Sequence, residues 1–249
     1  MGESMRVQKI LSLTAALLVF GQLALAAQKP ITAIPDITGT WESARDPSAP
    51  PAQQIQLKPE YLQQKQALTQ AISAATARGE PLATTTQRCL GDGMPGMMGG
   101  PFPMEILQSK GQVTIIQEAY TQVRRIYLDK PQKPVDEVEP GFFGRSVGHW
   151  EGGVLMVDTI GIKEDVLYRS NPHSSEMRIK EKIYYAPSGF LRDEVTIEDP
   201  VVLEKPYTYT VSYRRLPDYE MLEYVCEDNR YYVDEKGQQK LHLDAPVQK

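Results

Sequence analysis

The chain is poor in the residues from which metal and thiol chemistry are built. Its 249 residues include only three histidines and two cysteines. The histidines, His149, His173 and His242, lack the spacing of a metal site, and the cysteines form no CxxC motif. No glycine-rich loop leads into a helix, so a phosphate-binding loop is not expected either. We therefore expect neither a metal nor another cofactor.

An excess of positive charge is also missing. The chain carries 27 Lys+Arg against 32 Asp+Glu, a formal net charge of −5, and no run of like charges. This balance gives no electrostatic basis for binding nucleic acid. Long apolar runs are absent after residue 26, so the sequence predicts no membrane span. The expected partner is a small hydrophobic or aromatic molecule. The oligomeric state stays open, with a homodimer as one option.

The first 26 residues have the pattern of a secretory signal peptide. Arg6 and Lys9 precede an apolar run over residues 10–20, and Ala24-Leu25-Ala26 is a small-x-small cleavage site. A membrane anchor is excluded because Gly21 and Gln22 interrupt a run that is already too short to span. We expect cleavage near Ala26 and a mature protein that is periplasmic or secreted.

The two cysteines, Cys89 and Cys226, are expected to form a disulfide. In an oxidising compartment an even number of thiols is most simply read as paired. The bridge would close a loop of about 137 residues, for which the chain-entropy estimate is about 5 kcal/mol. A catalytic or metal-binding role for the pair has no supporting motif.

One helix is predicted, over about residues 59–78. Pro59 suits the first turn, and Gly79 follows Arg78 at the far end. Apolar residues recur on one side of this helix, which we expect to pack outside a sheet: Tyr61, Leu68, Ile72 and Ala75. The following segment, residues 91–103, holds five glycines and three prolines and is predicted to be a loop.

The rest of the chain has the pattern of short strands. Nineteen prolines and thirteen tyrosines favour many short extended segments. After a first strand over 36–43, the candidates are 104–109, 112–119, 122–128, 145–151, 154–160, 176–185, 190–198, 207–215 and 219–226. Short turns between them indicate antiparallel neighbours, and a meander of this length closes to remove its edges. The prediction is a mainly β, single-domain barrel over residues 27–233, followed by a polar tail over 234–249.

Two resemblances support this interpretation. Gly39-Thr40-Trp41 before an antiparallel meander resembles the start of lipocalin-like (calycin) barrels. A broader resemblance, to a family of exported bacterial proteins of unknown activity, implies export and a β-rich fold. Its motifs are at 88–90, 103–106, 124–127, 146–152, 172–174 and 197–200. Members of that family tend to have His where this chain has Arg145.

Charged residues interrupt the apolar register of several strands. Glu181 lies between Ile179 and Ile183, and Asp193 shares a face with Leu191 and Val195. An unpaired buried carboxylate is costly, so such a group is paired, protonated or faces a wet cavity. A structural ion pair and a polar site inside an apolar pocket are both consistent with this pattern.

Two further strands show similar interruptions. Arg125 is flanked by Val123 and Tyr127, although Ile126 and Leu128 leave the face of this strand open. In 145–151, Val147 shares its face with Arg145, His149 and Glu151, and Trp150 faces the other way.

Several residues are candidates for ligand contact. Tyr207, Tyr209 and Tyr213 form an aromatic stripe that suits either a core or a pocket for a flat ligand. Met97 and Met98 are expected in an adaptable apolar lid, with Cu(I) binding as an alternative. Tyr127, Trp150 and His173 complete the predicted set.

Two functions follow from these residues. The first is a cofactor-independent acid–base enzyme of the lyase, isomerase or hydratase type, acting on an aromatic or hydrophobic substrate. His149 would transfer protons, Glu181 or Asp193 would be an acid or base of raised pKa, and Arg125 would hold a developing anion. The second is a lipocalin-like carrier without catalysis. The inward-facing charges favour the enzyme slightly.

Overall fold

The computed structural model describes residues 34–79, 89–226, 231–233 and 239–241. One helix, α1 (Pro59–Ala77), and three short 3₁₀ helices, η1 (Gly96–Gly99), η2 (Ala119–Thr121) and η3 (Val135–Glu137), are present in this part. The strands are β1 (Gly39–Ser43), β2 (Met104–Ser109), β3 (Gln112–Gln117), β4 (Gln122–Leu128), β5 (Arg145–Glu151), β6 (Val154–Ile160), β7 (Arg178–Tyr185), β8 (Leu191–Glu198), β9 (Tyr207–Arg215), β10 (Tyr231–Val233) and β11 (Gln239–Leu241).

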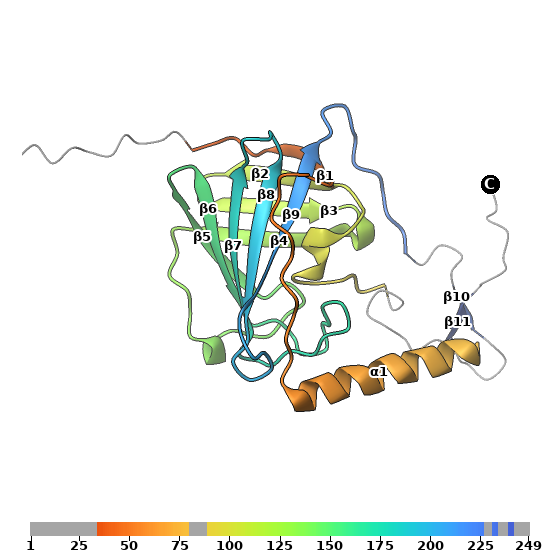
Figure 1. The fold of residues 1–249 in the computed structure, drawn as a ribbon. Helices are drawn as coiled ribbons and strands as arrows, with labels where there is room; N and C mark the ends of the chain where they lie inside the picture. Colours follow the sequence, from red (N-terminus) through yellow and green to blue (C-terminus); the bar gives the residue numbers. More distant parts are fainter. Residues whose placement is uncertain (1–33, 80–88, 227–230, 234–238, 242–249) are drawn as a thin grey trace, which may run out of the picture. The chain divides into compact units, whose positions relative to one another are not determined.

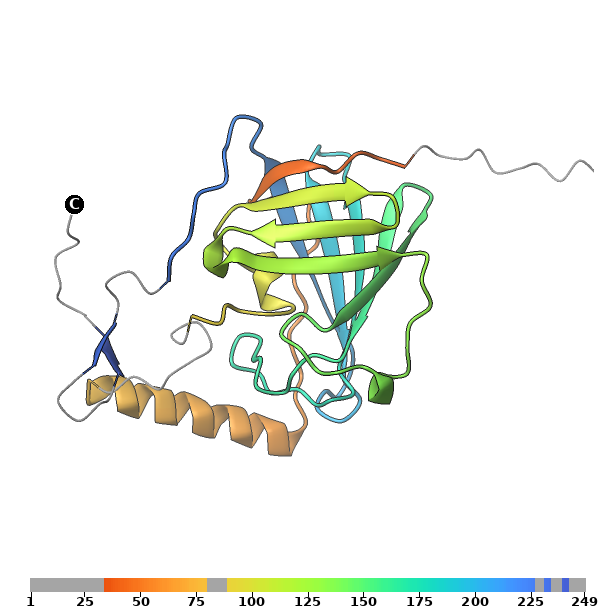
Figure 2. The ribbon, with the colours of Figure 1, turned by 180° about the vertical axis from the view of Figure 1, so that it is seen from behind.

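Strands β1 to β9 form a closed barrel in chain order (Figures 1 and 2). β1 closes it by pairing with β2 on one side and β9 on the other. Every neighbouring pair is antiparallel except β4 and β5, which are parallel. A parallel pair needs a crossover connection, and residues 129–144 provide it. The predicted mainly β barrel is therefore confirmed, whereas a purely antiparallel meander was wrong at this one step.

Most element boundaries agree with the sequence prediction, with a few exceptions. The helix begins at Pro59 and ends at Ala77, and Tyr61, Leu68, Ile72 and Ala75 are its less exposed side. The strand predicted over 219–226 is wrong, since these residues contain none. β11 lies inside the segment predicted as a polar tail. The predicted signal peptide, residues 1–26, lies outside the described residues.

The crosslink between Cys89 and Cys226 is present, with a Cα–Cα distance of 5.6 Å. A stable disulfide indicates folding in an oxidising, extracytoplasmic compartment. Within the described residues, no helix has both the length and the apolar character needed to cross a membrane.

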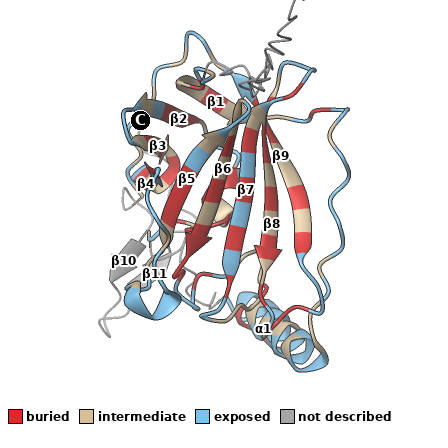
Figure 3. Cartoon of the chain, turned by 90° about the vertical axis from the view of Figure 1, so that its left-hand side faces the viewer, coloured by how far each residue is buried: buried red, intermediate tan, exposed pale blue. Residues whose placement is uncertain are grey.

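The barrel interior is filled mainly by apolar side chains that alternate with exposed ones. β7 shows the pattern clearly: Ile179, Glu181 and Ile183 are buried, whereas Arg178, Lys180 and Lys182 are exposed (Figure 3). This alternation is expected for a sheet with one face on the core and one in water. The interior therefore holds Glu181 at a position where its neighbours along the strand are isoleucines.

Glu181 is held by a bidentate ion pair that crosses the interior to β4. Arg124 Nη1 donates to Glu181 Oε1 at 2.8 Å, and Arg124 Nη2 donates to Glu181 Oε2. Arg124 also donates to Ser146 Oγ at 3.2 Å and to Thr159 Oγ1 at 3.0 Å. Both charged side chains have 0 % exposure. Such a pair is tolerated only because every strong donor and acceptor has a partner.

We expect Arg124→Met to destabilise the protein by about 3–5 kcal/mol, because it leaves the Glu181 carboxylate buried without its cation. Arg125→Met, at the adjacent exposed position, should change the free energy of unfolding by no more than about 0.5 kcal/mol. Urea unfolding measures both. The double variant Arg124→Met/Glu181→Leu should recover most of the free energy of unfolding that Arg124→Met loses, because it removes the unpaired carboxylate as well. Equal effects of the two arginine substitutions would contradict this account.

Candidate functional site

The four residues predicted as a catalytic set are not brought together. Glu181 and Asp193 lie in the barrel interior, with 1 % and 0 % exposure. Arg125 and His149 are exposed on the outer surface. An acid–base mechanism that needs all four groups around one ligand is therefore not assembled in this geometry.

The assignment of Arg125 to the interior was wrong by one residue. On β4, Gln122, Arg124, Ile126 and Leu128 are buried, and Arg125 is exposed. The apolar pair Ile126 and Leu128 shares the face of Arg124, so the alternation contained the correct register. The buried cation in the barrel interior is therefore Arg124 and not, as predicted, Arg125.

The inward placement of His149 was also wrong. The opposite, inward face of β5 carries Ser146, Gly148 and Trp150. Little space remains on that face, since a Cβ at Gly148 would lie 3.0 Å from Ile126 Cγ2. His149 instead borders an outer groove of about 580 Å³ across β5–β8. Six of the charged side chains of this groove are paired with one another, as Lys182 is with Glu194. The groove therefore offers few free polar groups.

Asp193 is the interior group without a hydrogen-bonding donor. Neither of its carboxyl oxygens accepts a hydrogen bond from any described residue. Burial, and secondly the nearby charge of Glu181, raise the pKa of Asp193 well above its ordinary value of 3.8, although Arg124 opposes the shift. With one cation and two carboxyls enclosed together, the protonated form of Asp193 keeps the interior neutral.

The predicted aromatic stripe faces inward as a packed element. Tyr207, Tyr209 and Tyr213 are 5 %, 6 % and 2 % exposed, and Tyr213 Oη donates to the carbonyl of Met98 at 2.7 Å. Tyr168 extends the row, because its ring stacks on Tyr209 with centroids 5.5 Å apart. Burial raises the pKa of Tyr209 well above 10, so the phenol stays neutral.

The other predicted ligand contacts are divided between the core and the surface. Met97 and Met98 are buried in the core and form no exposed lid. Trp150 belongs to the inward face of β5, where its Nε1 is buried without a partner, and Tyr127 is 40 % exposed on the outer face. His173 is half-buried, with Nδ1 2.9 Å from the Ser174 carbonyl and Nε2 3.0 Å from the Val166 carbonyl.

A cavity of about 620 Å³ opens instead beside the edge of β9. The segment after β1 bonds to β9 at two points, Ala44 N to the Ser212 carbonyl at 2.9 Å and Gln53 N to the Thr208 carbonyl at 3.0 Å. Between them, at Thr210, this segment forms no backbone hydrogen bond to the strand. The chain bows away from β9 there and leaves a gap in the wall.

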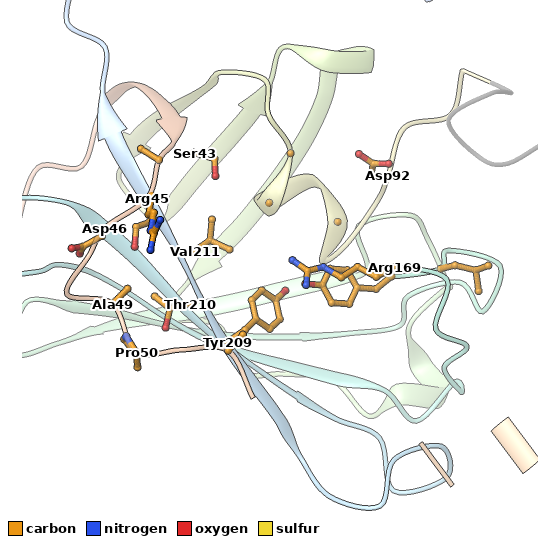
Figure 4. Close-up of a pocket in the computed structure, with 18 residues that line it drawn as sticks. Ser43, Arg45, Asp46, Ala49, Pro50, Asp92, Arg169, Tyr209, Thr210 and Val211 are labelled. Carbon is orange, nitrogen blue, oxygen red and sulfur yellow. The ribbon is translucent and has the colours of Figure 1, made fainter. Parts of the chain in front are cut away.

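We call this cavity the edge pocket. Its lining is drawn from four segments, residues 43–52, 92–100, 167–169 and 209–212 (Figure 4). Tyr209 and Val211 of β9 are at its inner side, and Arg45 and Asp92 lie on opposite sides of it in this view. Its size is within the usual range of small-molecule sites.

Three charged groups of the edge pocket have no charged partner in the described structure. Arg45 and Arg169 make no ion pair with any described carboxylate, and no hydrogen bond to the Asp92 carboxylate is formed within the same residues. Burial raises the pKa of Asp92 above its ordinary value. Asp46 differs, because it is bound by Arg192, Ser48 and Ser188, and these bonds hold its pKa low despite burial.

Arg169 is presented by a tight turn between Tyr168 and Asn171. Asn171 N donates to the Tyr168 carbonyl at 2.9 Å. The two central residues, Arg169 and Ser170, both have left-handed φ, +51° and +59°. Side chains are energetically disfavoured in this region, and such conformations concentrate at functional sites. The guanidinium lies 5.3 Å from the centre of the Tyr168 ring, which fixes its direction.

The base of this loop is tied to the barrel by His173 and its neighbour. Ser174 N and Oγ donate to the Asp199 carboxylate at 2.7 and 2.9 Å, and Asp199 is buried. His173 connects that anchor to the carbonyl of Val166, three residues before Arg169. The predicted ligand-binding residue His173 is therefore seen in the structure as a support for the turn.

The opposite wall is the loop over residues 91–103. Gln122 Oε1 accepts hydrogen bonds from Asp92 N and Gly93 N, each at 3.0 Å. Gln117 Nε2 donates to the Met97 carbonyl at 2.7 Å. Barrel side chains therefore hold the loop backbone, and the space next to its outer residue, Gly99, is open.

No family model matches the chain, and no curated protein matches it either. The class that the structure defines is a closed, mixed β-barrel of nine strands. The edge-pocket residues Arg45, Asp92 and Arg169 were not identified from the sequence. They lie in loops, where no periodicity marks the direction of a side chain, and only the glycine-rich composition of 91–103 signalled an unusual segment.

Because the pKa of Asp193 is raised in the folded state, the unfolded chain ionises first as pH rises from about 4. The wild type should then lose stability relative to Asp193→Asn by about 1.4 kcal/mol per pH unit until the folded-state pKa is reached. Urea unfolding at pH 4, 5.5 and 7 measures this difference. Parallel stability curves for the two proteins would contradict a raised pKa.

We expect Ser170→Gly to stabilise the protein by about 1 kcal/mol, because glycine adopts the left-handed conformation without a penalty and is favoured at the second central position of such a turn. Arg169→Gly should stabilise the protein less than Ser170→Gly does, since it also removes the contact between the guanidinium and the Tyr168 ring. Urea unfolding measures both variants. A destabilised Ser170→Gly would show that the turn is unstrained.

Proposed function

We propose that the protein is an exported small-molecule-binding protein whose ligand occupies the edge pocket. The observation that carries this proposal is a cavity of about 620 Å³ in which Arg45, Asp92 and Arg169 have no charged partner among the described residues. Arg45 and Arg169 are exposed and Asp92 is half-buried, so all three charges are accessible to a ligand that enters a cavity of this size. A small aromatic or hydrophobic body would contact Val211, Leu167 and Pro50.

The same proposal includes the finer features expected from the sequence. Removal of residues 1–26 would place the protein in the periplasm or outside the cell, consistent with the disulfide. A relation to lipocalin-like barrels would suit a carrier, although in this chain the ligand would enter beside β9 and not through the barrel axis. The packed interior supports this route, because the Arg124–Glu181 pair and its partners occupy the barrel centre.

Acid–base catalysis in the same pocket is the second candidate. Asp92 favours it, since it is a half-buried carboxyl in the pocket lining whose pKa is raised by burial, and such groups serve as acids and bases. In that case the native ligand, extracted from protein purified from its host, would be chemically altered on incubation with the protein, and Asp92→Asn would abolish the change. A carrier would return the ligand unaltered.

The binding proposal is tested by filling the pocket. Gly99 lines it, needs no left-handed φ, and has no heavy atom within 4 Å of the position that an added Cβ would take. Gly99→Leu should therefore fold normally and block the cavity. Gly141→Leu is the matched control, because Gly141 has the same free space and lies outside the pocket lining.

The probes are 2-naphthoate and 2-naphthalenemethanol, with binding followed by equilibrium dialysis and folding by circular dichroism. We expect the wild type and Gly141→Leu to bind at least one probe alike, and Gly99→Leu to bind it at least about tenfold more weakly. Equal binding by all three proteins, or no binding by the wild type, would refute the edge pocket as the site.

A further inference from the structure

The charges that face the edge pocket are not balanced. Asp46 is committed to Arg192, with Arg192 Nε donating to Asp46 Oδ2 at 2.8 Å, so it is not available to Arg45. Asp92 has its pKa raised by burial, with no arginine among the groups that act on it. Two guanidinium groups, Arg45 and Arg169, therefore face the cavity without a carboxylate from the described chain.

Arg169 is positioned more firmly than an ordinary surface arginine. Its ring partner Tyr168 stacks on Tyr209, and Tyr209 stacks on Tyr207 with centroids 5.3 Å apart. The guanidinium thus ends a row of three aromatic rings that begins in the barrel wall. A planar guanidinium held in a fixed direction loses little entropy when it binds a planar anion.

The remaining wall is chemically different. Val211, Leu167 and Pro50 contribute apolar surface, and Thr210 leaves its edge of β9 without a partner strand on this side. Figure 4 shows Arg169 on the same side of the pocket as Asp92 and Arg45 across from it, with Val211 and Tyr209 between them. A ligand that suits these walls has an anionic end and a mostly apolar body.

We infer that the edge pocket selects organic anions, with a carboxylate bound by Arg169, the positive charge of Arg45 facing it across the pocket, and an apolar or aromatic body against Val211 and Leu167. This inference rests on the proposed function and adds the chemical class of its ligand. A carboxylate accepts paired hydrogen bonds from a guanidinium fork, and charge-assisted bonds are about twice as strong as neutral ones. A neutral molecule of the same shape forms only the apolar contacts.

The test compares two probes of similar size, the anion 2-naphthoate and the neutral 2-naphthalenemethanol. We expect the wild type to bind the naphthoate at least about tenfold more tightly. Arg45→Gln and Arg169→Gln should each weaken naphthoate binding several-fold, and the double variant should remove the preference while binding of the alcohol stays unchanged. Lys110→Gln, which removes one exposed charge in the β2–β3 turn, is the control and should leave both affinities as they are.

The preference should also fall as salt is raised from about 20 to about 500 mM, because partly exposed ion pairs are screened. Equal affinities for the two probes, or a preference that survives the double arginine variant, would overturn the inference. If Gly99→Leu still abolished binding of both probes in that case, the proposed function would stand and only the anion selectivity would fall. If neither probe bound the wild type, both would fall together.

Discussion

The ion pair between Arg124 and Glu181 determines how the inside of this barrel can be used. It joins β4 to β7 through the interior, and Ser146 and Thr159 complete its hydrogen bonds from β5 and β6. Burying two charges is tolerable only while this geometry is kept, so the strands that carry them cannot separate to admit a ligand without a large penalty. Asp193 adds to the constraint, because burial beside Glu181 raises its pKa and favours its neutral form.

Because the ion pair occupies the barrel interior, the cavity lies beside the barrel wall, at β9. The strand pair that closes the barrel is short, because β1 pairs with β9 over only Trp41–Ser43. Further along, the chain bows away from β9. An unpaired strand edge is a liability in a soluble protein, and natural proteins cover it with loops. Here the covering loops leave a cavity whose walls carry charges without a described partner, so protection of the edge and formation of the pocket come from the same arrangement.

Alternation along strands made the fold and the burial of Glu181 and Asp193 predictable. At Arg124 and Arg125 the wrong residue was chosen, because two adjacent arginines carry the same charge and the apolar pair Ile126 and Leu128 was not used to identify the buried face. The parallel step between β4 and β5 was missed because the connection over 129–144 contains no strand pattern that would show the chain returning. The pocket residues could not be found, since Arg45 and Arg169 are placed by backbone bonds and left-handed φ angles that leave no periodic trace in the sequence.

The disulfide has a consequence for when the pocket is completed. Cys89 is three residues before Asp92, so the crosslink to Cys226 fastens the entry of the very segment that forms one wall of the cavity. The far end of that segment is fixed separately, where it continues into β2. Without the bridge, the entry of this segment would be held only by hydrogen bonds such as those of Asp92 N and Gly93 N to Gln122. The position of this pocket wall therefore depends on the oxidising conditions under which the bridge is stable.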